Sequence, residues 1–214
     1  MPAPPDKSPL TARAAALDIL GSVLPRGAAL DEALASHDGM GRLEARDRAF
    51  ARLLIATTLR RLGQIDALIS HCLDRPLGRK SGRIQDILRL GVCQLVFLAT
   101  PPHAAVDGAV ALVGKNRAYR GLVNAVLRRL AREGAELAQA QDAARLNTPD
   151  WLWRRWRKAH GETVTRAIAE AHLADPPLDF TVKSDPEGWA ARLQATILPT
   201  GSLRRGAGGA VEGL

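Results

Sequence analysis

The sequence is poor in aromatic residues and has no long apolar run. Phe, Trp and Tyr make up 4% of the 214 residues, whereas 46% of the chain is hydrophobic and the composition is rich in Ala, Leu and Arg. Such a composition favours helices over a β-sandwich or a β-barrel. A chain of this length can bury one core of ordinary domain size, with a small remainder. We therefore expect a mainly α protein with one principal domain and an appendage.

Cysteine is equally scarce, which bears on disulfides and metal sites. Cys72 and Cys93 lie in apolar helical patterns without a second Cys or a His at metal-ligand spacing. We expect both to be small buried hydrophobic side chains, with no metal bound, in a reducing cytoplasm. The opening MPAPPDKSPL lacks the hydrophobic run of a signal peptide, and no segment approaches the roughly 20 apolar residues of a membrane span. We expect a soluble, cytoplasmic protein with no membrane partner.

Positive charge, in contrast, is abundant. The chain has 30 basic and 22 acidic residues, a net charge of +8 and a pI near 10.4. Such a surface attracts polyanions, and nucleic acid is the leading candidate. Arg outnumbers Lys 25 to 5, and a guanidinium group can bind phosphate through two parallel hydrogen bonds or stack on a base. A GC-rich genome would produce the same bias, so both interpretations stay open.

Apolar residues at three- and four-residue spacing predict a series of helices. After a flexible tail over 1–7, with Ser8 and Pro9 as N-cap and first helical residue, helices are expected at about 9–24, 28–36, 44–62, 65–72, 84–98, 106–113 and 117–130, with a Gly-rich turn at 38–41 and a break at Thr100-Pro101-Pro102. The buried face of the 44–62 helix is predicted to hold Phe50, Leu53, Leu54 and Thr57. Gly91, in the middle of the 84–98 helix, indicates that another helix packs closely there.

Charge is concentrated in the same part of the chain as the core. Residues 83–132 carry eight basic side chains against two acidic ones. On the 117–130 helix, a row of polar side chains recurs at three- and four-residue steps, so that it lies on one face and can follow a phosphate backbone. The candidate RNA-binding residues here are Arg117, Arg120, Asn124 and Arg128, with the preceding Lys115 and, on the 44–62 helix, Arg46 and Arg48.

Beyond Glu133 the character of the sequence changes. A polar helix continues over 134–146, Thr148-Pro149 begins another, and WLWRRWRKAHGE follows with three Trp and four basic residues. Leu152 and Trp156 lie one turn apart on this helix, and a first interpretation places both side chains in the protein core. A second interpretation makes Trp153 exposed, so that it would stack on RNA while Arg154, Arg155 and Lys158 grip the phosphates.

The last segment is predicted to be a small α/β unit. Alternation in LDFTVK predicts a strand from Leu178 to Val182, a helix is expected over 188–195, and a Gly-rich stretch ends the sequence. We expect these elements not to close a sheet, and to be the start of an α/β segment that leads to another domain.

Five motifs give the chain a resemblance to a known family. They are ARDRAFARLL at 45–54, TLRRLGQID at 58–66, ILRLGVCQLVFL at 87–98, PPHAAVDGAV at 101–110 and GLVNAVLRRL at 121–130. In these motifs the chain resembles the Sun/Fmu/RsmB-type ribosomal RNA cytosine-C5 methyltransferases, which begin with a domain similar to the antitermination factor NusB. The resemblance implies a NusB-like antiparallel helical bundle over 8–133 that binds RNA, a helical linker over 134–175 and the start of an α/β segment over 176–214.

The motifs that carry the chemistry of this family are not found in this sequence. Those enzymes bind S-adenosylmethionine in a Rossmann-like domain and use a catalytic cysteine together with a Pro-Cys motif. Cys72 follows His71 and Cys93 follows Val92, so neither cysteine belongs to a Pro-Cys motif. The GAGGA stretch at 206–210 lacks the preceding strand and the following acidic residue of a cofactor loop. We expect no catalytic, cofactor-binding or metal-binding residue, and predict that this chain is inactive alone.

Three further polar residues could suggest an enzyme, but each has a structural interpretation. His103 follows Pro102 and is expected to cap or pack at the start of its helix. Asp47 and Asp66 are expected to be helix-terminal or inter-helix hydrogen-bonding partners rather than acid-base groups. A catalytic role is therefore not assigned to them.

The function implied is that of a region that docks ribosomal RNA for a catalytic domain absent from this chain. Two alternatives stay open. The chain could be a free-standing NusB-like module that works with a small ribosomal protein in antitermination, or a structural spacer whose basic surface aids only folding or solubility.

Overall fold

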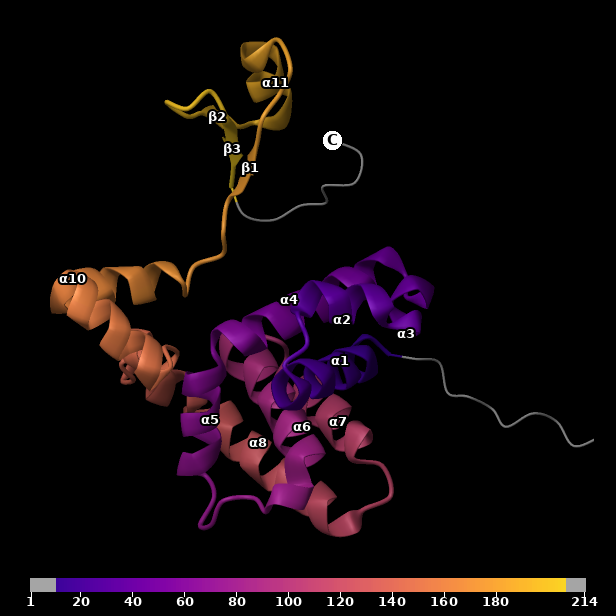
Figure 1. Cartoon of the computed structure of the whole chain (residues 1–214). Coiled ribbons are helices and arrows are strands. Elements are labelled where there is room, and N and C mark those ends of the chain that lie inside the picture. The colour runs from indigo at the N-terminus through magenta and orange to yellow at the C-terminus, as the bar shows by residue number, and fades with distance from the viewer. Residues whose placement is uncertain (1–10, 207–214) are drawn as a thin grey trace, which may run out of the picture. The chain divides into compact units, whose positions relative to one another are not determined.

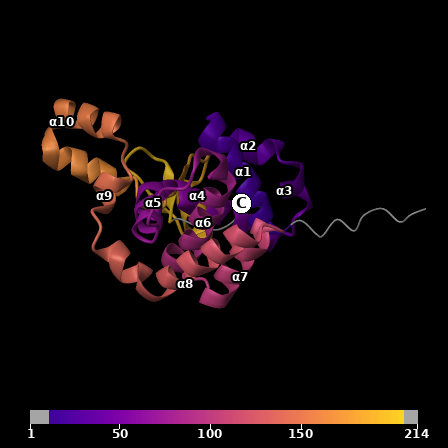
Figure 2. The ribbon, with the colours of Figure 1, turned by 90° about the horizontal axis from the view of Figure 1, so that it is seen from below.

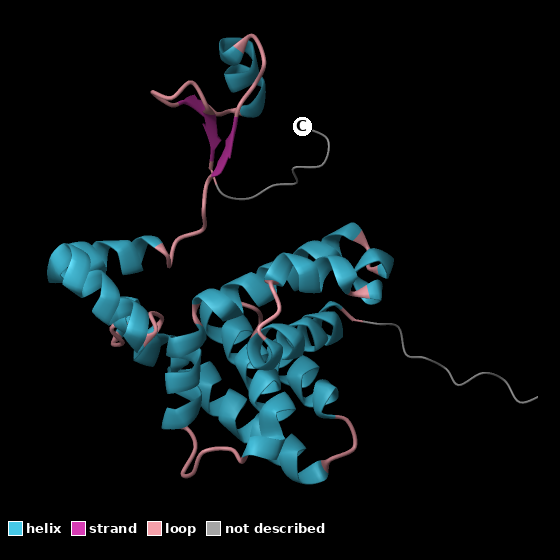
Figure 3. Ribbon diagram, viewed as in Figure 1, coloured by secondary structure: helices cyan, strands magenta, loops and turns pink. Residues whose placement is uncertain are grey.

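The structure is a computed structural model that describes residues 11–206, without the side chain of Arg79. The flexible tail predicted for 1–7 and the cap predicted at Ser8-Pro9 lie outside these residues. The helices are α1 (Ala12–Arg26), α2 (Leu30–Ser36), α3 (Asp38–Arg42), α4 (Ala45–Arg60), α5 (Leu62–His71), α6 (Gly82–Val92), α7 (Pro102–Val113), α8 (Arg117–Gln139), α9 (Ala143–Leu146), α10 (Asp150–Ala171) and α11 (Pro186–Leu193), with short turns η1 (Arg79–Ser81) and η2 (Cys93–Phe97) (Figure 1). The prediction of a mainly α protein is confirmed, and within residues 11–206 the strands form one small sheet (Figure 3).

The first helix shows how the local sequence sets helix ends. The Thr11 side chain accepts a hydrogen bond from the backbone N–H of Ala14 at 3.2 Å, which satisfies one of the free donors at the start of α1. At the other end Gly27 adopts φ +68°, a left-handed conformation that glycine enters without steric cost.

Helix α6 is the centre of the bundle, where it packs against α1, α5, α7 and α8. Its buried residues include Ile87, Leu88 and Leu90. A Cβ on Gly91 would lie 2.6 Å from Cδ1 of Leu127 on α8, closer than real Cβ contacts come. The close helix approach predicted at Gly91 is therefore confirmed, and α8 is the helix that makes it.

The predicted 84–98 helix is two elements. Regular α-helix ends at Val92, and a π-helical turn follows, in which the N–H of Leu98 donates to the carbonyl of Cys93 at 3.1 Å. The turn places Gln94 in the core, where its side chain accepts from Arg13 Nε at 2.7 Å and donates to the Leu90 carbonyl at 3.0 Å. These bonds satisfy a buried amide, so its burial does not leave an unpaired polar group.

The predicted buried face of α4 is partly wrong. Leu54 and Thr57 are buried as expected, but Leu53 is 46% exposed, and the face turns instead toward Ala51 and Ile55. The reason is that α4 packs against α1 and also against η2 and α6, so the buried arc is set by three neighbours rather than by one apolar stripe. The turn predicted at 38–41 is also wrong, since residues 38–42 form α3 and bury Met40.

Helix α9 is joined to α5 by a small polar network. The side chain of Asn147 accepts from the N–H of Gln64 at 3.1 Å and donates to the Gln64 side-chain oxygen at 3.0 Å. Gly63 makes this approach possible, because a Cβ there would overlap the backbone carbonyl of Leu146. The segment after α8 is thus anchored to the bundle.

The chain divides into two compact units, Met1–Ala169 and Glu170–Leu214. The second unit holds β1 (Leu178–Phe180), β2 (Thr196–Ile197) and β3 (Leu203–Arg205), which form an antiparallel sheet in the order β1-β3-β2. The predicted strand at 178 is present, but it ends at Phe180. The expectations that these elements close no sheet and that no strand precedes the Gly-rich stretch are wrong, since β3 ends directly before Gly206. Residues 207–210 of GAGGA lie outside the described part.

Candidate nucleic-acid interface

The predicted polar row on α8 is present at the surface. Arg117, Arg120 and Arg128 are exposed and Asn124 is half-buried. At 100° per residue these four, which we call the α8 row, occupy an arc of about 80° and span about 16 Å of helix. The Asn124 side chain accepts from Arg128 Nε at 3.0 Å, which holds the last arginine along the row. The structure therefore brings the predicted residues of this helix together.

The first turn of α8 adds to the positive potential of the row. Asn116 caps the helix by accepting from the N–H of Tyr119 at 3.4 Å, and the exposed Lys115 directly precedes it. The helix dipole contributes partial positive charge at this end. Within residues 11–206, none of Lys115, Arg117 and Arg120 forms an ion pair. These cations remain available to an anionic partner.

The other predicted residues lie on different elements. Arg46 is exposed and Arg48 half-buried in the first turn of α4, which packs on α1, whereas α8 packs on α6 and α7. In Figure 1 the start of α4 lies next to α3, whereas the start of α8 lies at the lower edge of the bundle. Arg154 and Arg155 are exposed on α10. The predicted residues thus form separate groups on three helices.

Several other arginines form ion pairs with carboxylates of the same chain. Ion pairs join Arg83 to Asp18, Arg89 to Asp66 and Asp86, Arg129 to Glu133, Arg145 to Asp150, Arg166 to Asp142 and Arg204 to Asp179. An arginine already bonded to a carboxylate has less to gain from a phosphate. The count of 30 basic residues therefore overstates the number of cations available to a partner.

Helix α10 is a hairpin of two helical halves. Between them Gly161 has φ +79° and ψ 172°, and Figure 2 shows α10 folded back on itself. This backbone conformation is almost restricted to glycine. Trp153, from the first half, is 5% exposed and packs with Ala144 of α9 and Ala169 of the second half. The guanidinium groups of Arg145 and Arg166 lie 5.3 and 5.7 Å from the centre of its ring.

These contacts correct the prediction for the tryptophan segment. Trp153, expected as the exposed ring, is the buried one, while Leu152 and Trp156, expected in the core, are half-buried. The exposed ring is Trp151, at 61%. Three tryptophans within six residues leave the phase of the buried face open, and the covering residues Ala144 and Ala169, which select Trp153, come from outside the motif. The motif alone therefore does not identify Trp151 as the exposed ring.

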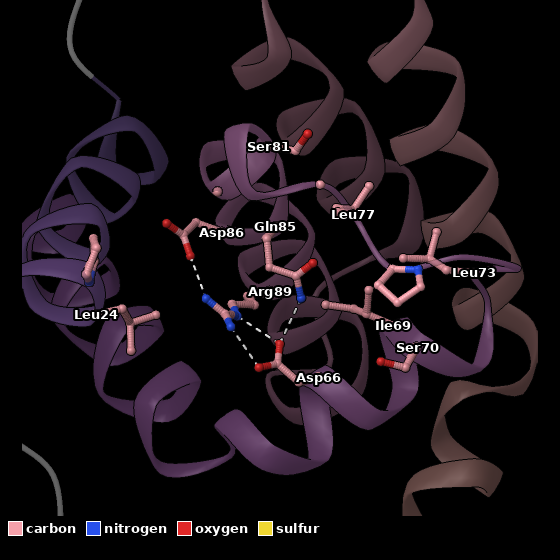
Figure 4. A pocket seen from close by; sticks show the side chains of 14 residues that line it. Leu24, Asp66, Ile69, Ser70, Leu73, Leu77, Ser81, Gln85, Asp86 and Arg89 are labelled. Carbon is pink, nitrogen blue, oxygen red and sulfur yellow. Dashed lines mark hydrogen bonds and ion pairs between the residues drawn. The ribbon is translucent and has the colours of Figure 1, made fainter.

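A cavity between elements of the bundle contains an arginine that is bonded to carboxylates of the protein itself. It encloses about 740 Å³ beside α5 and α6 (Figure 4). Arg89 donates from Nε and Nη2 to the Asp66 carboxylate at 2.8 and 2.7 Å, and from Nη1 to Asp86 at 2.8 Å. Gln85 also donates to Asp66, at 3.0 Å. Each guanidinium nitrogen has a carboxylate partner, and the inter-helix role predicted for Asp66 is confirmed.

The ionisation of this cluster reflects both its burial and its hydrogen bonds. Burial alone would lower the pKa of Arg89, but hydrogen bonds and charge from Asp66, and then from Asp86, outweigh it and raise the pKa. Burial also raises the pKa of Asp86, although the hydrogen bond from Arg89 opposes that change. The arginine stays charged and shared between two carboxylates, which stabilises the contact of α5 with α6.

The two cysteines differ in their exposure. Cys93 is buried, and burial raises the pKa of its thiol to about 11, while Cys72 is half-buried. His103 is exposed in the first turn of α7. Over residues 11–206 there is no cluster of His, Cys, Asp and Glu able to hold a metal ion. None of the helices in this range is long and apolar enough to span a membrane.

Comparison with known proteins identifies the bundle. Proteins named ribosomal RNA small subunit methyltransferase B, from Escherichia coli, Shigella boydii and Escherichia fergusonii, are each 35% identical over 158 residues, which cover 69% of this chain and 36% of the relative. The chain therefore spans about a third of the length of these relatives. The sequence model of the NusB family matches residues 10–132, more than half of the chain. By this match, and with the helical bundle that those residues form, the chain belongs to the NusB family.

Proposed function

We propose that this chain is an RNA-binding part of a ribosomal RNA (cytosine-C5) methyltransferase, and that it docks structured ribosomal RNA for a catalytic domain outside this sequence. The observation that carries the proposal is the α8 row with Lys115, which places four exposed cations along the first turns of α8. Phosphate contacts of this kind position a protein on RNA without reading its sequence. The chemistry on the RNA would then belong to the rest of the enzyme.

We propose that S-adenosylmethionine, the cofactor that the resemblance implies for the full-length enzyme, binds outside this chain. A Rossmann-like site lies at the carboxyl ends of parallel strands, where a glycine-rich turn enters a helix. The sheet within residues 11–206 is antiparallel and its strands have two or three residues. We assign no residue of this chain to the cofactor, and we expect no methyl transfer by this chain alone. A cytoplasmic location fits this role.

The length of the similarity favours the methyltransferase over a free-standing NusB-like module. The alignment with the methyltransferases runs over 158 residues, more than the span 10–132 matched by the NusB family can hold. Helices α9 and α10 lie beyond the residues matched by the NusB family, so a module that ended with the bundle would not include them. If a small ribosomal protein were recovered with the chain in a pull-down, the antitermination alternative would gain support.

A salt titration with ribosomal RNA tests the proposal. Affinity should fall steeply as salt rises, because each phosphate contact releases counter-ions. Replacing Arg117 and Arg120 with Glu should weaken binding and lower the slope of log affinity against log salt by about one for each phosphate that the variant no longer binds. The matched control is the Arg42→Glu, Arg75→Glu variant, which changes the net charge equally at exposed residues of α3 and the loop after α5.

Two results would count against the proposal. Undetectable or salt-independent binding by the unaltered chain would exclude phosphate docking. An equal reduction of affinity in both double variants would mean that net charge alone attracts RNA, and it would support the spacer alternative. Circular dichroism should show the same helix content in all three proteins, since the four arginines are exposed and make no ion pair within residues 11–206.

A further inference from the structure

The outer face of the first half of α10 combines an exposed aromatic ring with three cations. Trp151, Arg154, Arg155 and Lys158 follow one another at steps of three, one and three residues, and all four are exposed. At 100° per residue they fall within an arc of about 100°. The buried Trp153 lies on the opposite side of the helix. We call these four residues the α10 face.

The exposed ring calls for a partner more strongly than an exposed aliphatic side chain would. Tryptophan is highly buried on average, and it combines a large apolar ring with a single N–H donor. Trp151 is 61% exposed, although the adjacent hairpin core shields Trp153 almost completely. The apolar core of the hairpin therefore buries Trp153 but not Trp151.

The charges of the α10 face select the class of partner. Asp150 is the only acidic residue between 150 and 160, and it pairs with Arg145. Arg154 donates to the Asp150 backbone carbonyl at 3.3 Å, and within residues 11–206 no carboxylate bonds to Arg154, Arg155 or Lys158. A flat π-face flanked by unpaired cations complements a base joined to phosphates, whereas a protein surface would need a matching cluster of acidic groups.

We propose that the α10 face binds unpaired nucleotides of RNA, with Trp151 stacked on a base and Arg154, Arg155 and Lys158 on the adjoining phosphates. Trp151 and Lys158 are about 10 Å apart along the helix axis, which fits a stretch of about three stacked nucleotides. Single strands present free base faces, whereas the bases of an A-form duplex are already stacked inside it. The proposal rests on the RNA binding proposed above and adds the form of RNA that this second face recognises.

The experiment compares two RNA probes by fluorescence anisotropy: an unstructured single strand of about 12 nucleotides and a duplex of the same length. Trp151→Ala should weaken binding of the single strand about 5- to 150-fold, the range expected when one stacked base is no longer held. Binding of the duplex should change less than twofold, since stacking makes no contribution to it. Trp151→Phe should retain most of the affinity for the single strand, because phenylalanine keeps an aromatic face.

Val164→Ala provides the matched control. Val164 is 47% exposed and lies in the second half of α10, away from the α10 face, so its truncation should leave both affinities unchanged. Thermal unfolding should be the same for both variants, because each removes an exposed side chain.

The outcomes separate this proposal from the one on which it rests. If the unaltered chain binds neither probe, phosphate docking itself is wrong. If it binds RNA and Trp151→Ala binds the single strand equally well, docking stands and base stacking is wrong, and the exposed ring would instead be assigned to a protein contact. An equal reduction of affinity for duplex and single strand would also overturn the stacking proposal.

Discussion

Replacing Gly91 with Ala tests the packing on which the bundle is built. The new Cβ would lie 2.6 and 2.8 Å from the two δ carbons of Leu127 and 3.3 Å from its Cγ. Leu127 is fully buried, so its side chain has little room to turn away. Contacts shorter than 3.0 Å require α6 and α8 to move apart or Leu127 to leave its preferred rotamer.

The expected magnitude has two parts of opposite sign. Overpacking a dense core costs about 1–3 kcal/mol. An alanine inside a helix is more favourable than a glycine by about 1 kcal/mol. The net change for Gly91→Ala should therefore lie between about zero and 2 kcal/mol of destabilisation. Gly121→Ala is the matched control, because Gly121 lies inside α8 and a Cβ there would meet nothing within 4 Å.

Denaturant unfolding monitored by circular dichroism measures the difference between the two variants. Gly121→Ala should stabilise the chain by up to about 1 kcal/mol. The two variants should then differ by about 1–3 kcal/mol, or by several degrees in Tm at about 2–4 °C for each kcal/mol. Equal stabilisation of both would refute the close contact of α6 with α8.

Three other changes probe separate parts of the molecule. Gly63→Ala should destabilise the chain by about 2 kcal/mol or more and should increase proteolysis between α8 and α9, since its Cβ would overlap the Leu146 carbonyl; unchanged protection would contradict the anchoring. Cys93, with its pKa raised to about 11 by burial, should resist alkylation at pH 8 until denaturant is added, and rapid native labelling on mass spectrometry would be inconsistent with that burial. The pKa of Asp142 is lowered, chiefly by the hydrogen bond from Arg166, so its stabilising effect should be complete above an unfolded pKa of about 3.9 and lost as pH falls below it; Asp142→Asn should remove this part of the acid transition seen in tryptophan emission.

Much of the bundle could be predicted because its signals are local. Gly91 in an apolar helical pattern indicated a close helix contact, and Asp66 could be assigned to an inter-helix bond rather than to chemistry. The α8 row was also predictable, because three- and four-residue steps place side chains on one face whatever packs on the other. What the sequence could not show is that six other arginines are bonded to carboxylates, since most of those partners are distant along the chain.

Two of the failures, on α10 and α4, share one physical cause, which is that residues outside the motif determine which side of the helix is buried. The side of α10 that is buried depends on Ala144 and Ala169, and the exposure of Leu53 depends on how three elements meet α4. The strand at Leu203 was missed because a three-residue segment with two arginines is too short to show alternation. Its partners on either side determine that it is extended.

The reversal of α10 at Gly161 affects how strongly the α10 face can bind. A solvent-exposed segment that became helical only on contact with RNA would lose backbone entropy of about 1–2 kcal/mol for each residue ordered. Here the reversal brings Ala169 and Arg166 against Trp153 and holds the first half of the helix from behind. The α10 face is thus preorganised, and a small set of contacts can give measurable affinity because the backbone is already ordered before RNA arrives.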